Sequence, residues 1–478
     1  MADRKSIYVT TTLPYVNGKP HMGHALEFVQ ADVIARFKRA TGHDVFFNTG
    51  TDEHGLKIYR MAQEEGIPVQ AYVDRNAQVF NDFGAKLHLS FDNFIRTTDA
   101  HHKNAAQEFW RICKKNGDIY KKMYSIMYCV GCELEKTNSE LINGECPIHP
   151  GKKLEHIEEE NYFFRFSKYG KQLLDVYHRE QNKGGFVIPP SRLHEIERFV
   201  EGGLEDFSIS RLKEKMPWGV SVPDDPAHVM YVWFDALVNY ISAIGWPTDM
   251  ERFEKWWPVL QFAGKDNLRQ QSAMWQAMLF SAGLFPSEQI VIHGFVTSKG
   301  QKMSKSIGNV IDPLAIVQEY GVDALRYYLV REISTFEDGD FTHEQFKEAY
   351  NANLANGIGN LTARIMKMAE MYLLAPIEAK DQSFPQEYTE VLEAYDVQKA
   401  ANVVWRYIGK LDRYIQETQP FKLVKEDTEK GIEVIKKLVA DLAFIAGMLA
   451  PFLPETAEKI ITAIEANKMP ESLFVRKE

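Results

Sequence analysis

The chain has 478 residues, of which 45% are hydrophobic and 12% aromatic, so we expect two or three globular domains, each with its own core. The formal net charge of −10 excludes attraction to nucleic acid over the whole surface, so any RNA contact must use a local basic patch. The sequence has no run of eighteen apolar residues, no secretory signal and only four cysteines, which predicts a cytoplasmic protein without a membrane span or a disulfide framework.

The first part of the chain, to about residue 115, alternates β-branched runs with amphipathic stretches. Residues 7–12 and 45–50 predict strands, and residues 25–37 and 56–65 predict helices. Alternation of this kind favours a parallel sheet with helices on both faces. From 116 to 215 turns, cysteines and aromatic strands such as 161–166 take over, which indicates an insertion into that fold.

Strand patterns resume after the insertion and stop near Phe341. The expected strands are 229–234, 259–264 and 290–295. Helical spacing of apolar residues then begins around Leu354 and recurs in further segments, namely 388–418, 427–448 and 454–467. This last region is predicted to be an α-helical bundle.

Two short motifs far apart in the chain point to a triphosphate. Pro20-His21-Met22-Gly23-His24 lies between a strand and a helix, where two histidines beside a glycine suit a polyphosphate. Lys302-Met303-Ser304-Lys305-Ser306 supplies two ammonium groups on a loop, suited to charge that shifts during a reaction. Alone, the first motif could be two capping or surface histidines and the second a solvated surface run.

Two carboxylates follow predicted strands. Asp52 comes after the strand that ends near Gly50, and Asp266 follows Gly264. Open α/β sheets bind ligands at this position, so Asp52 is a candidate for an ammonium group and Asp266 for ribose hydroxyls. Each could instead be a helix N-cap, a position that Asp favours.

A metal site is predicted from spacing. Cys129-Val130-Gly131-Cys132 and Cys146-Pro147-Ile148-His149 are two knuckles separated by thirteen residues. Four such ligands, Cys129, Cys132, Cys146 and His149, form a closed tetrahedral set typical of structural Zn²⁺. The alternative is four reduced residues in a metal-free loop.

The two motifs in this order are the signature pair of class I aminoacyl-tRNA synthetases. Leu13-Pro14-Tyr15-Val16-Asn17-Gly18, the Thr51-Asp52-Glu53-His54 segment and Tyr231-Val232-Trp233-Phe234-Asp235-Ala236 resemble the methionyl-tRNA synthetases over nearly the whole chain. The insertion of roughly a hundred residues is too short for the editing domain of related enzymes.

The resemblance implies roles for named residues. It assigns catalysis to His21, His24, Lys302 and Lys305, and ATP binding to Gly23, Asp266, His293, Gly294 and Ser304. It assigns the amino acid to Leu13, Tyr15, Asp52, Trp233, Tyr240 and Gln271, with Asp52 holding the α-amino group; plain core is the alternative for Trp233. The chain departs from the family at Asn267, usually apolar, and at Gln271, usually histidine.

The resemblance also implies anticodon contacts in the helical region. Asn360 and Arg364, spaced i and i+4, would read bases, and Phe421 would stack on one where relatives have tryptophan. The alternatives are a solvated face for Asn360 and Arg364 and an inward-packed helix start for Phe421.

The implied protein is an α/β enzyme with a class I Rossmann-type parallel sheet, an inserted zinc-knuckle connective domain and a C-terminal α-helical bundle. The expected ranges are the first catalytic half 1–115, the connective insertion 116–215, the second catalytic half 216–295, the lysine loop with a stem-contact region 296–345, and the anticodon-binding bundle 346–478. We expect a monomer that uses ATP with Mg²⁺, L-methionine and tRNA(Met). A ligase for another amino acid and a catalytically silent tRNA-binding protein remain alternatives.

Overall fold

The computed structural model describes residues 5–132, 134–136, 140–179, 184–303, 309–377 and 383–478. The chain forms two compact units that each combine separate stretches of sequence. Unit 1 comprises Met1–Pro20, His43–Phe83 and Phe91–Ile292, and unit 2 comprises His21–Gly42, Gly84–Ser90 and His293–Glu478. The five domain ranges expected from the sequence remain a prediction.

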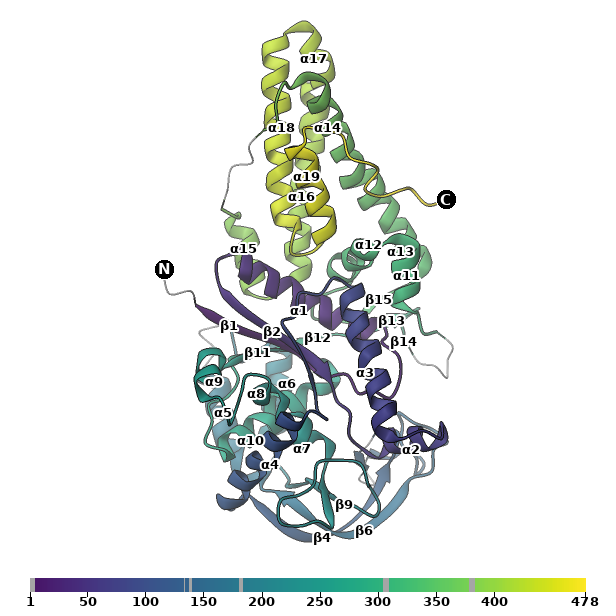
Figure 1. Cartoon of the computed structure of the whole chain (residues 1–478), viewed down its shortest axis with the longest axis vertical. Coiled ribbons are helices and arrows are strands. Elements are labelled where there is room, and N and C mark those ends of the chain that lie inside the picture. The colour runs from purple at the N-terminus through teal and green to yellow at the C-terminus, as the bar shows by residue number, and fades with distance from the viewer. Residues whose placement is uncertain (1–4, 133, 137–139, 180–183, 304–308, 378–382) are drawn as a thin grey trace. The chain divides into compact units, whose positions relative to one another are not determined.

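The predicted parallel sheet is present and forms the centre of unit 1 (Figure 1). Its strand order is β3-β2-β1-β11-β12-β7, and β1 pairs in parallel with both β2 and β11. The strands are β1 Ser6–Thr11, β2 Asp44–Thr51, β3 Asn93–Arg96, β7 Val187–Ile188, β11 Val259–Gly264 and β12 Gln289–His293. Every residue of β11 is buried, as is typical of parallel strands covered on both faces.

Helices of unit 1 complete its core. They are α2 Leu56–Glu64, α3 Val69–Lys86, α4 Ala100–Lys115, α5 Gly170–Arg179, α6 Pro190–Glu201, α7 Val232–Ala236, α8 Asn239–Ser242, α9 Met250–Trp256 and α10 Trp275–Ser281, with short segments η2 Phe166–Tyr169, η4 Lys265–Asn267 and η5 Gln270–Met274. Phe109 and Trp110 of α4 are fully buried, and Phe109 lies against Trp275 with ring centroids 5.7 Å apart. Aromatic rings at such separations contribute beyond the area that they bury.

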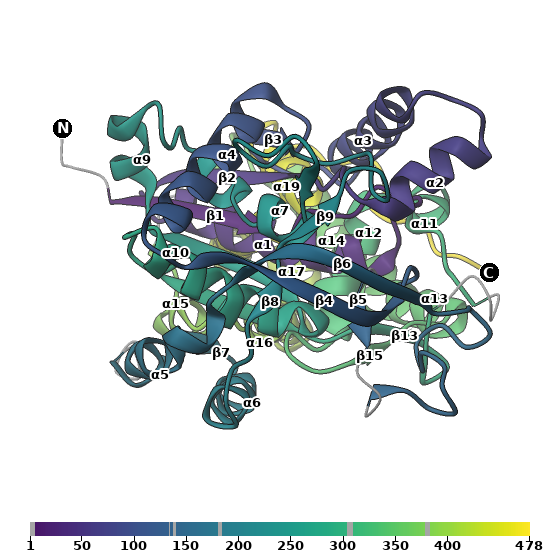
Figure 2. The same cartoon turned by 90° about the horizontal axis from the view of Figure 1, so that it is seen from below.

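The insertion folds as an antiparallel sheet of order β5-β4-β6-β8 within unit 1 (Figure 2). Its strands are β4 Ile119–Cys129, β5 Leu134–Lys136, β6 Glu155–Phe164 and β8 Phe207–Ser208, and a second small sheet pairs β9 Ser210–Leu212 with β10 His228–Met230. The strand expected at 161–166 is therefore the end of β6. The β4–β6 ladder runs from Ile119↔Phe164 to Tyr128↔Glu155 and presents the predicted metal ligands at its tip.

One expected strand is wrong. Residues 229–234 were expected to form a strand throughout, but β10 ends at Met230 and α7 begins at Val232. The apolar run is β-like in composition, yet Phe234 is buried edge-on against Phe109 and Trp110. Tertiary packing therefore overrides local β propensity here.

Unit 2 contains the predicted helical bundle. After the short strand β15 Gly339–Asp340, the described elements are all helices. Its helices are α1 Met22–Ala40, α11 Pro313–Tyr320, α12 Val322–Tyr327, α13 His343–Ala349, α14 Asn360–Tyr372, α15 Gln386–Glu393, α16 Val397–Thr418, α17 Pro420–Glu426, α18 Thr428–Leu449 and α19 Pro454–Glu465, with π-helices η6 Tyr328–Glu332 and η7 Tyr350–Gly359. A three-stranded sheet joins β14 Gln301–Lys302, β13 Val296–Ser298 and β15 Gly339–Asp340 in that order.

A buried ion pair ties α1 to the other helices of unit 2. Arg326 of α12 and Asp32 of α1 are both fully buried, and Nη2 of Arg326 lies 2.7 Å from Oδ2 of Asp32. The same guanidinium donates to the carbonyls of Leu87, Pro451 and Phe452. Burial alone would raise the pKa of Asp32, but the guanidinium groups of Arg326 and Arg36 lower it below its usual range.

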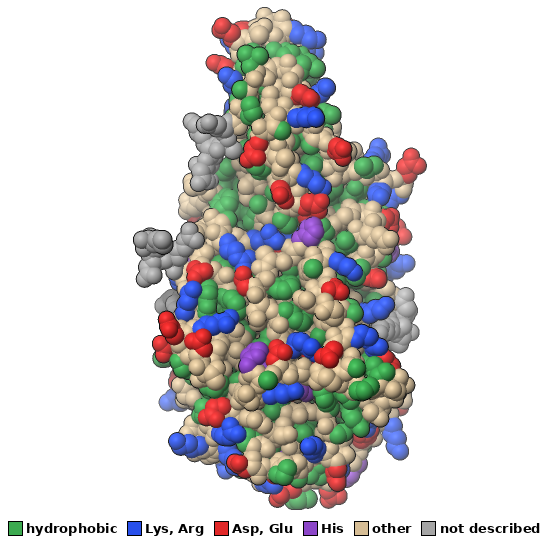
Figure 3. Space-filling model, in the orientation of Figure 1, with side chains coloured by type: hydrophobic (Ala, Val, Ile, Leu, Met, Phe, Trp, Pro, Cys, Tyr) green, Lys and Arg blue, Asp and Glu red, His purple; other side chains and the backbone are tan. Residues whose placement is uncertain are grey.

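No helix among the described residues has the length and apolar character needed to cross a membrane. On the face shown in Figure 3, acidic and basic side chains are interspersed. This distribution agrees with the expectation that RNA would be bound locally rather than by the whole surface.

Candidate functional site

The predicted nucleotide motif of unit 2 begins α1. His21 is the N-cap residue: its Nδ1 accepts a hydrogen bond from the Gly23 amide at 3.1 Å. The amide of His21 in turn donates to Nδ1 of His24 at 3.2 Å, so the two histidines complete a capping box. Their rings stack with centroids 3.7 Å apart. A Cβ on Gly23 would lie 3.0 Å from the His21 ring, so glycine at this position avoids a close contact with the stacked rings.

The capping box fixes the tautomer of both rings. Because each Nδ1 accepts from a backbone amide, the proton of the neutral ring sits on Nε2. Desolvation and the adjacent His21 ring hold the pKa of His24 well below its usual range, so that ring is neutral at physiological pH. The capping alternative is therefore correct for His21, and it still leaves an Nε2–H donor suited to a phosphate oxygen.

His293 and Gly294 lie in the same unit. Nε2 of His293 is 3.0 Å from Oε2 of Glu27 on α1, and both side chains are buried. Nδ1 of His293 lies 2.7 Å from the Gly294 carbonyl oxygen. A Cβ on Gly294 would come within 2.2 Å of the Glu337 backbone, so only glycine fits there.

The lysine motif follows a tight hairpin. β13 and β14 are joined by Lys299 and Gly300, both with positive φ, as a two-residue type I′ turn requires. Oδ1 of Asp340 accepts from the Gly300 amide at 2.9 Å and fastens the turn to β15. Lys302 ends β14, while Ser304 and Lys305 lie outside the described residues.

Of the predicted amino-acid residues, Tyr15 and Asp52 come together in unit 1. Tyr15 and Asp52 form a parallel bridge, in which the Asp52 amide donates to the Pro14 carbonyl at 2.9 Å and the Val16 amide to the Asp52 carbonyl at 3.1 Å. Leu13 and Tyr15 are half-buried and Asp52 is 7% exposed. The N-cap alternative for Asp52 is wrong, because Gly55 caps α2.

Trp233 and Tyr240 lie on neighbouring short helices. Trp233 of α7 is half-buried, whereas Tyr240 of α8 is buried. The ring of Tyr240 lies 5.9 Å from that of Trp275.

A buried His–Asp–His cluster, which the sequence interpretation missed, supports these helices. Oδ2 of Asp235 in α7 lies 2.9 Å from Nδ1 of His54, and Oδ1 lies 3.1 Å from Nε2 of His102. Nδ1 of His102 is 2.9 Å from Oγ of Ser242 in α8. Burial alone would raise the pKa of Asp235, but His54 and His102 lower it. His54 stands two residues after Asp52, and Asp235 stands two residues after Trp233. This proximity in sequence to predicted site residues is the signal that could have revealed the cluster.

Gln271 lies in the π-helix η5 and is buried. Its Oε1 accepts from Nε2 of Gln261 at 2.9 Å, and its backbone carbonyl accepts from Gln276 at 2.7 Å. Ser287 closes this network by bonding both Gln276 and Gln261. The glutamine that replaces the usual histidine is therefore held in a fixed orientation by other amides.

Asp266 lies just beyond the carboxyl end of β11, in the short helix η4, with its side chain exposed. The N-cap alternative is wrong here too, since Gly264 precedes η4 and no side chain caps it. Asn267, the other departure from the family pattern, is half-buried, and its amide lies 3.4 Å from Oδ1 of Asp266.

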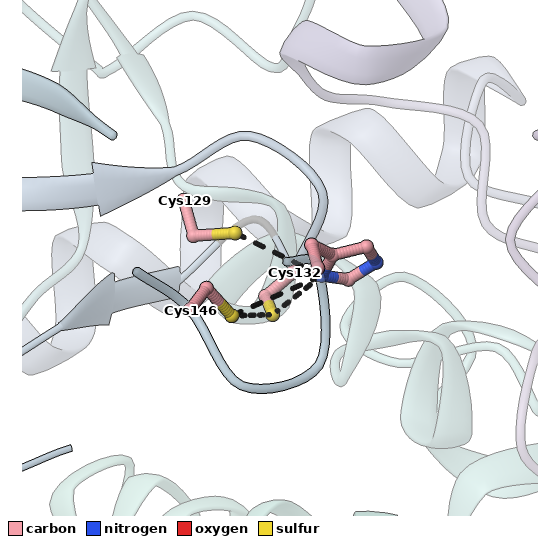
Figure 4. A group of neighbouring side chains, drawn as sticks. Cys129, Cys132 and Cys146 are labelled. Carbon is pink, nitrogen blue, oxygen red and sulfur yellow. Dashed lines mark hydrogen bonds between the residues drawn. The ribbon is translucent and has the colours of Figure 1, made fainter. Parts of the chain in front are cut away.

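The predicted metal ligands Cys129, Cys132, Cys146 and His149 converge at the tip of the β4–β6 hairpin (Figure 4). Their ligand atoms all lie within 4.8 Å of one another. Sγ of Cys132 is 3.5 Å from Sγ of Cys146, and Nδ1 of His149 is 3.8 Å from Sγ of Cys129. Tetrahedral coordination with bonds of about 2.3 Å spaces its ligands by roughly 3.8 Å, so the four residues fit a bound metal ion. A Cβ on Gly131 would meet the His149 ring at 2.6 Å, so glycine is required between the first two ligands.

The predicted anticodon residues lie in unit 2. Asn360 begins α14 and is exposed. Nη1 of Arg364 lies 2.6 Å from Oδ1 of Asp412 on α16, with both side chains 37% exposed. Phe421 in α17 is 46% exposed, so the inward-packed alternative for it is wrong. All three side chains reach solvent.

Two family models together match most of the chain. One described as tRNA synthetases class I (M) matches residues 7–156 and 137–366, and one described as the anticodon binding domain of methionyl tRNA ligase matches residues 366–473.

Known proteins resemble the chain over nearly its whole length. The methionine–tRNA ligase of Caldanaerobacter subterraneus subsp. tengcongensis is 40% identical over 96% of this chain and 73% of its own. That of Thermotoga maritima is 41% identical over 97% of this chain and 76% of its own. The structure of Mycobacterium tuberculosis methionyl-tRNA synthetase in complex with methionyl-adenylate is similar with a TM-score of 0.88, 36% identity and 99% coverage of both chains.

Proposed function

Because this chain belongs to the class I tRNA synthetases of the methionyl type, we propose that it activates L-methionine with ATP and transfers the methionyl group to tRNA(Met). The methionine carboxylate attacks the α-phosphorus of ATP, methionyl-adenylate forms and pyrophosphate leaves. The acyl group then passes to the 3′-terminal ribose of the tRNA. The continuous match to a catalytic and an anticodon-binding family model carries this proposal.

The protein's task in the first step is positioning and charge stabilisation. In our proposal the Nε2–H groups of His21 and His24 donate to phosphate oxygens, with Gly23 giving the backbone room. The neutral state of His24 supports a donor role, because its capped Nδ1 leaves the proton on Nε2. Lys302 and Lys305 neutralise the departing pyrophosphate.

Other groups hold the rest of the nucleotide. We assign the ribose hydroxyls to Asp266, and further ATP contacts to His293, Gly294 and Ser304. The His293–Glu27 pair fixes the His293 ring beside the start of the lysine hairpin. Mg²⁺ would accompany ATP, bound mostly by phosphates and water.

Methionine is held by a carboxylate and an aromatic wall. Asp52 pairs with the α-ammonium group, while Leu13, Tyr15, Trp233, Tyr240 and Gln271 surround the thioether, which suits aromatic contacts. The Tyr15↔Asp52 bridge supports joint action, because it links the aromatic segment to the carboxylate.

The remaining assignments concern the metal and the tRNA. We assign the Cys₃His cluster to Zn²⁺, which would have a structural role there because four protein ligands leave no open position for substrate. Asn360, Arg364 and Phe421 contact the anticodon, a role supported by their exposure and by the adjoining anticodon-domain match.

Amino-acid-dependent ATP–pyrophosphate exchange with all twenty amino acids tests the activation step. Exchange with methionine alone is the expected result. Exchange with another amino acid instead would show that methionine is not the substrate. We would then attribute the changed specificity to Asn267 and Gln271, where the chain departs from the family pattern. If folded and metal-loaded protein shows no exchange with any amino acid, the activation reaction is refuted and the catalytically silent tRNA-binding protein becomes the favoured alternative.

A further inference from the structure

The buried His–Asp–His cluster of unit 1 joins elements that lie far apart in the sequence. Asp235 is fully buried, and its two carboxylate oxygens lie 2.9 Å from Nδ1 of His54 and 3.1 Å from Nε2 of His102. Nδ1 of His102 extends the cluster to Oγ of Ser242 at 2.9 Å. The segment after β2, α4, α7 and α8 therefore meet around one carboxylate. None of these four side chains has a role in the proposed reaction.

Three of the four elements also carry proposed methionine contacts. Asp52, proposed for the α-ammonium group, precedes His54 by two residues. Trp233 precedes Asp235 by two residues in α7, and α8 carries Tyr240. The hydrogen bonds of the cluster therefore connect the residue proposed for the ammonium end of methionine with two residues proposed for its side chain.

The two short helices depend on tertiary contacts for their position. α7 has 5 residues and α8 has 4, and neither has a side-chain N-cap. Helices of this length have little stability of their own. α4 is longer, with 16 residues, and its Phe109 and Trp110 are fully buried in the core. His102 of α4 is thus a fixed point that holds Asp235, and with it α7.

The segment that contains Asp52 is also fixed from a second side. The buried carboxylate of Glu53 accepts two hydrogen bonds from Arg96 of β3, at 2.7 and 2.8 Å. The Glu53 carbonyl accepts from Nε1 of Trp218 at 2.6 Å, and the Trp218 ring lies 5.6 Å from that of His54. Because Glu53 is held by β3 and His54 by the cluster, the backbone at Asp52 has little freedom to move.

The charge of the cluster strengthens these connections. Burial opposes ionisation of Asp235, but His54 and His102 lower its pKa below the usual range. An ionised carboxylate can only accept hydrogen bonds, so Nδ1 of His54 and Nε2 of His102 donate to it. Charge-assisted hydrogen bonds are shorter and stronger than neutral ones. The carboxylate therefore restrains the elements that supply its two donors.

We propose that Asp235 is a positioning residue that sets the distance between the proposed ammonium site, Asp52, and the proposed side-chain wall. Trp233 and Tyr240 are the parts of that wall which the cluster holds. The inference rests on the proposed function and concerns selectivity between amino acids of different side-chain length. A pocket of fixed length accepts methionine and rejects ethionine, which is one methylene longer. A pocket whose two ends are loosely connected binds methionine more weakly and discriminates less.

Substitutions within the cluster separate positioning from packing. Asp235→Asn is nearly isosteric, but it replaces one acceptor oxygen by an amide donor, so one histidine loses its hydrogen bond. His102→Leu removes the donor to Asp235. His102→Gln retains an N–H donor near the position of Nε2 and is the conservative variant.

Asp118→Asn provides a matched control. Asp118 is 1% exposed and, like Asp235, belongs to unit 1. Its carboxylate accepts from Tyr169 at 2.6 Å and from Ser281 at 2.9 Å, and it pairs with Lys168 at 2.7 Å. None of these partners lies within two residues of a proposed methionine contact. The control therefore alters a buried carboxylate without altering the proposed positioning.

Asp235→Asn and His102→Leu should each raise KM for methionine in pyrophosphate exchange by about tenfold and leave KM for ATP unchanged. The preference for methionine over ethionine, measured as the ratio of their kcat/KM values, should fall by about fivefold, because one methylene in a fitted pocket is worth roughly 10–200-fold. This ratio does not depend on how much of a variant is folded. His102→Gln should keep most of the preference, and Asp118→Asn should match the parent protein in both quantities.

Parent-like KM and preference in both Asp235→Asn and His102→Leu would overturn the proposal and make the cluster purely structural. Equal increases in KM for methionine and for ATP would also overturn it. Methionine-dependent exchange in the parent protein would at the same time support the proposed function, so the two failures are distinguishable. If the parent protein shows no exchange, the proposed reaction fails and equilibrium dialysis with L-methionine decides the positioning role. Weaker binding by Asp235→Asn than by the parent protein would then support it, and equal or absent binding would overturn it.

Discussion

His21 serves the fold and, in our proposal, the reaction through different nitrogens of one ring. Nδ1 caps α1 by accepting from the Gly23 amide, and Nε2 carries the proton. The sequence offered capping and ligand binding as competing explanations for this residue. The geometry makes them compatible, because the cap determines which nitrogen can donate to a phosphate.

The two roles of His21 can be separated by substitution. His21→Asn retains an N-cap acceptor, so the free energy of unfolding should stay close to that of the parent protein, whereas His21→Ala should lose about 1 kcal/mol. Both variants should form methionyl-adenylate at least tenfold more slowly, because both lack the phosphate donor. Urea unfolding and pyrophosphate exchange measure the two effects. Normal exchange by His21→Asn would show that His21 acts only as a cap.

At the scale of the secondary-structure elements, the predicted metal ligands at the tip of β4 and β6 lie mostly outside these strands. Cys129 ends β4, while Cys146 and His149 lie in the loop that precedes β6. Spacing alone predicted this cluster, because two knuckles bring four ligands to one ion whatever the surrounding fold. A metal ion held by these four residues would reinforce the small apolar cluster of Cys129, Cys146 and Leu154 at this tip.

Removal of the metal should loosen this tip selectively. A chelator should extract about one metal ion per chain, and limited proteolysis should then cut between residues 129 and 149. Methionine-dependent exchange should change much less, because the cluster holds no substrate. His149→Cys should keep the metal through a Cys₄ set, and Cys146→Ala should lose it. Equal protease resistance with and without metal would contradict a structural role.

The ion pair between α14 and α16 places Arg364 at the surface of the bundle. Arg364→Ala should leave pyrophosphate exchange unchanged and lower kcat/KM for tRNA charging by about tenfold to a hundredfold, as expected for a lost base contact. Lys437→Ala, which breaks an exposed pair on α18 with Asp441, is the control and should affect neither reaction. A slower activation step in Arg364→Ala would argue against an anticodon role.

At the scale of the whole molecule, the two compact units do not follow the order of the chain. α1 follows β1 in sequence, yet it belongs to unit 2, where Asp32 pairs with Arg326. The apolar periodicity of 25–37 predicted the helix correctly but could not reveal this partner, which lies 294 residues away. Asp32 and Glu27 are tolerated in this buried helix because each has a partner, Arg326 for Asp32 and His293 for Glu27.

Asp32→Asn should destabilise the protein most at neutral pH. Removing one partner of a buried ion pair typically costs about 3–5 kcal/mol. The pKa of Asp32 is lowered in the folded protein, so its carboxylate stabilises the fold above the unfolded-state pKa of about 3.9 and loses this effect as pH falls towards the lower folded pKa. The difference in unfolding free energy between the parent protein and Asp32→Asn should therefore be largest at pH 7 and shrink below about pH 4.

Urea unfolding at several pH values between 3 and 7 measures this difference. Asp441→Asn, which alters an exposed pair, should cost under about 1 kcal/mol at every pH. A constant difference for Asp32→Asn across the range would show that the carboxylate charge does not contribute.

The sequence alone determined the features that are encoded locally. Hydrophobic periodicity predicted the parallel sheet and the helical bundle, the change to turns, cysteines and aromatic strands predicted the insertion, and ligand spacing predicted the Cys₃His cluster; all are present. Tertiary structure decided the rest, because those features join residues distant in sequence. It made 232–236 a helix and set Asp235 between histidines 181 and 133 positions away. Each of these depends on side chains meeting in the folded core, where packing outweighs local preference.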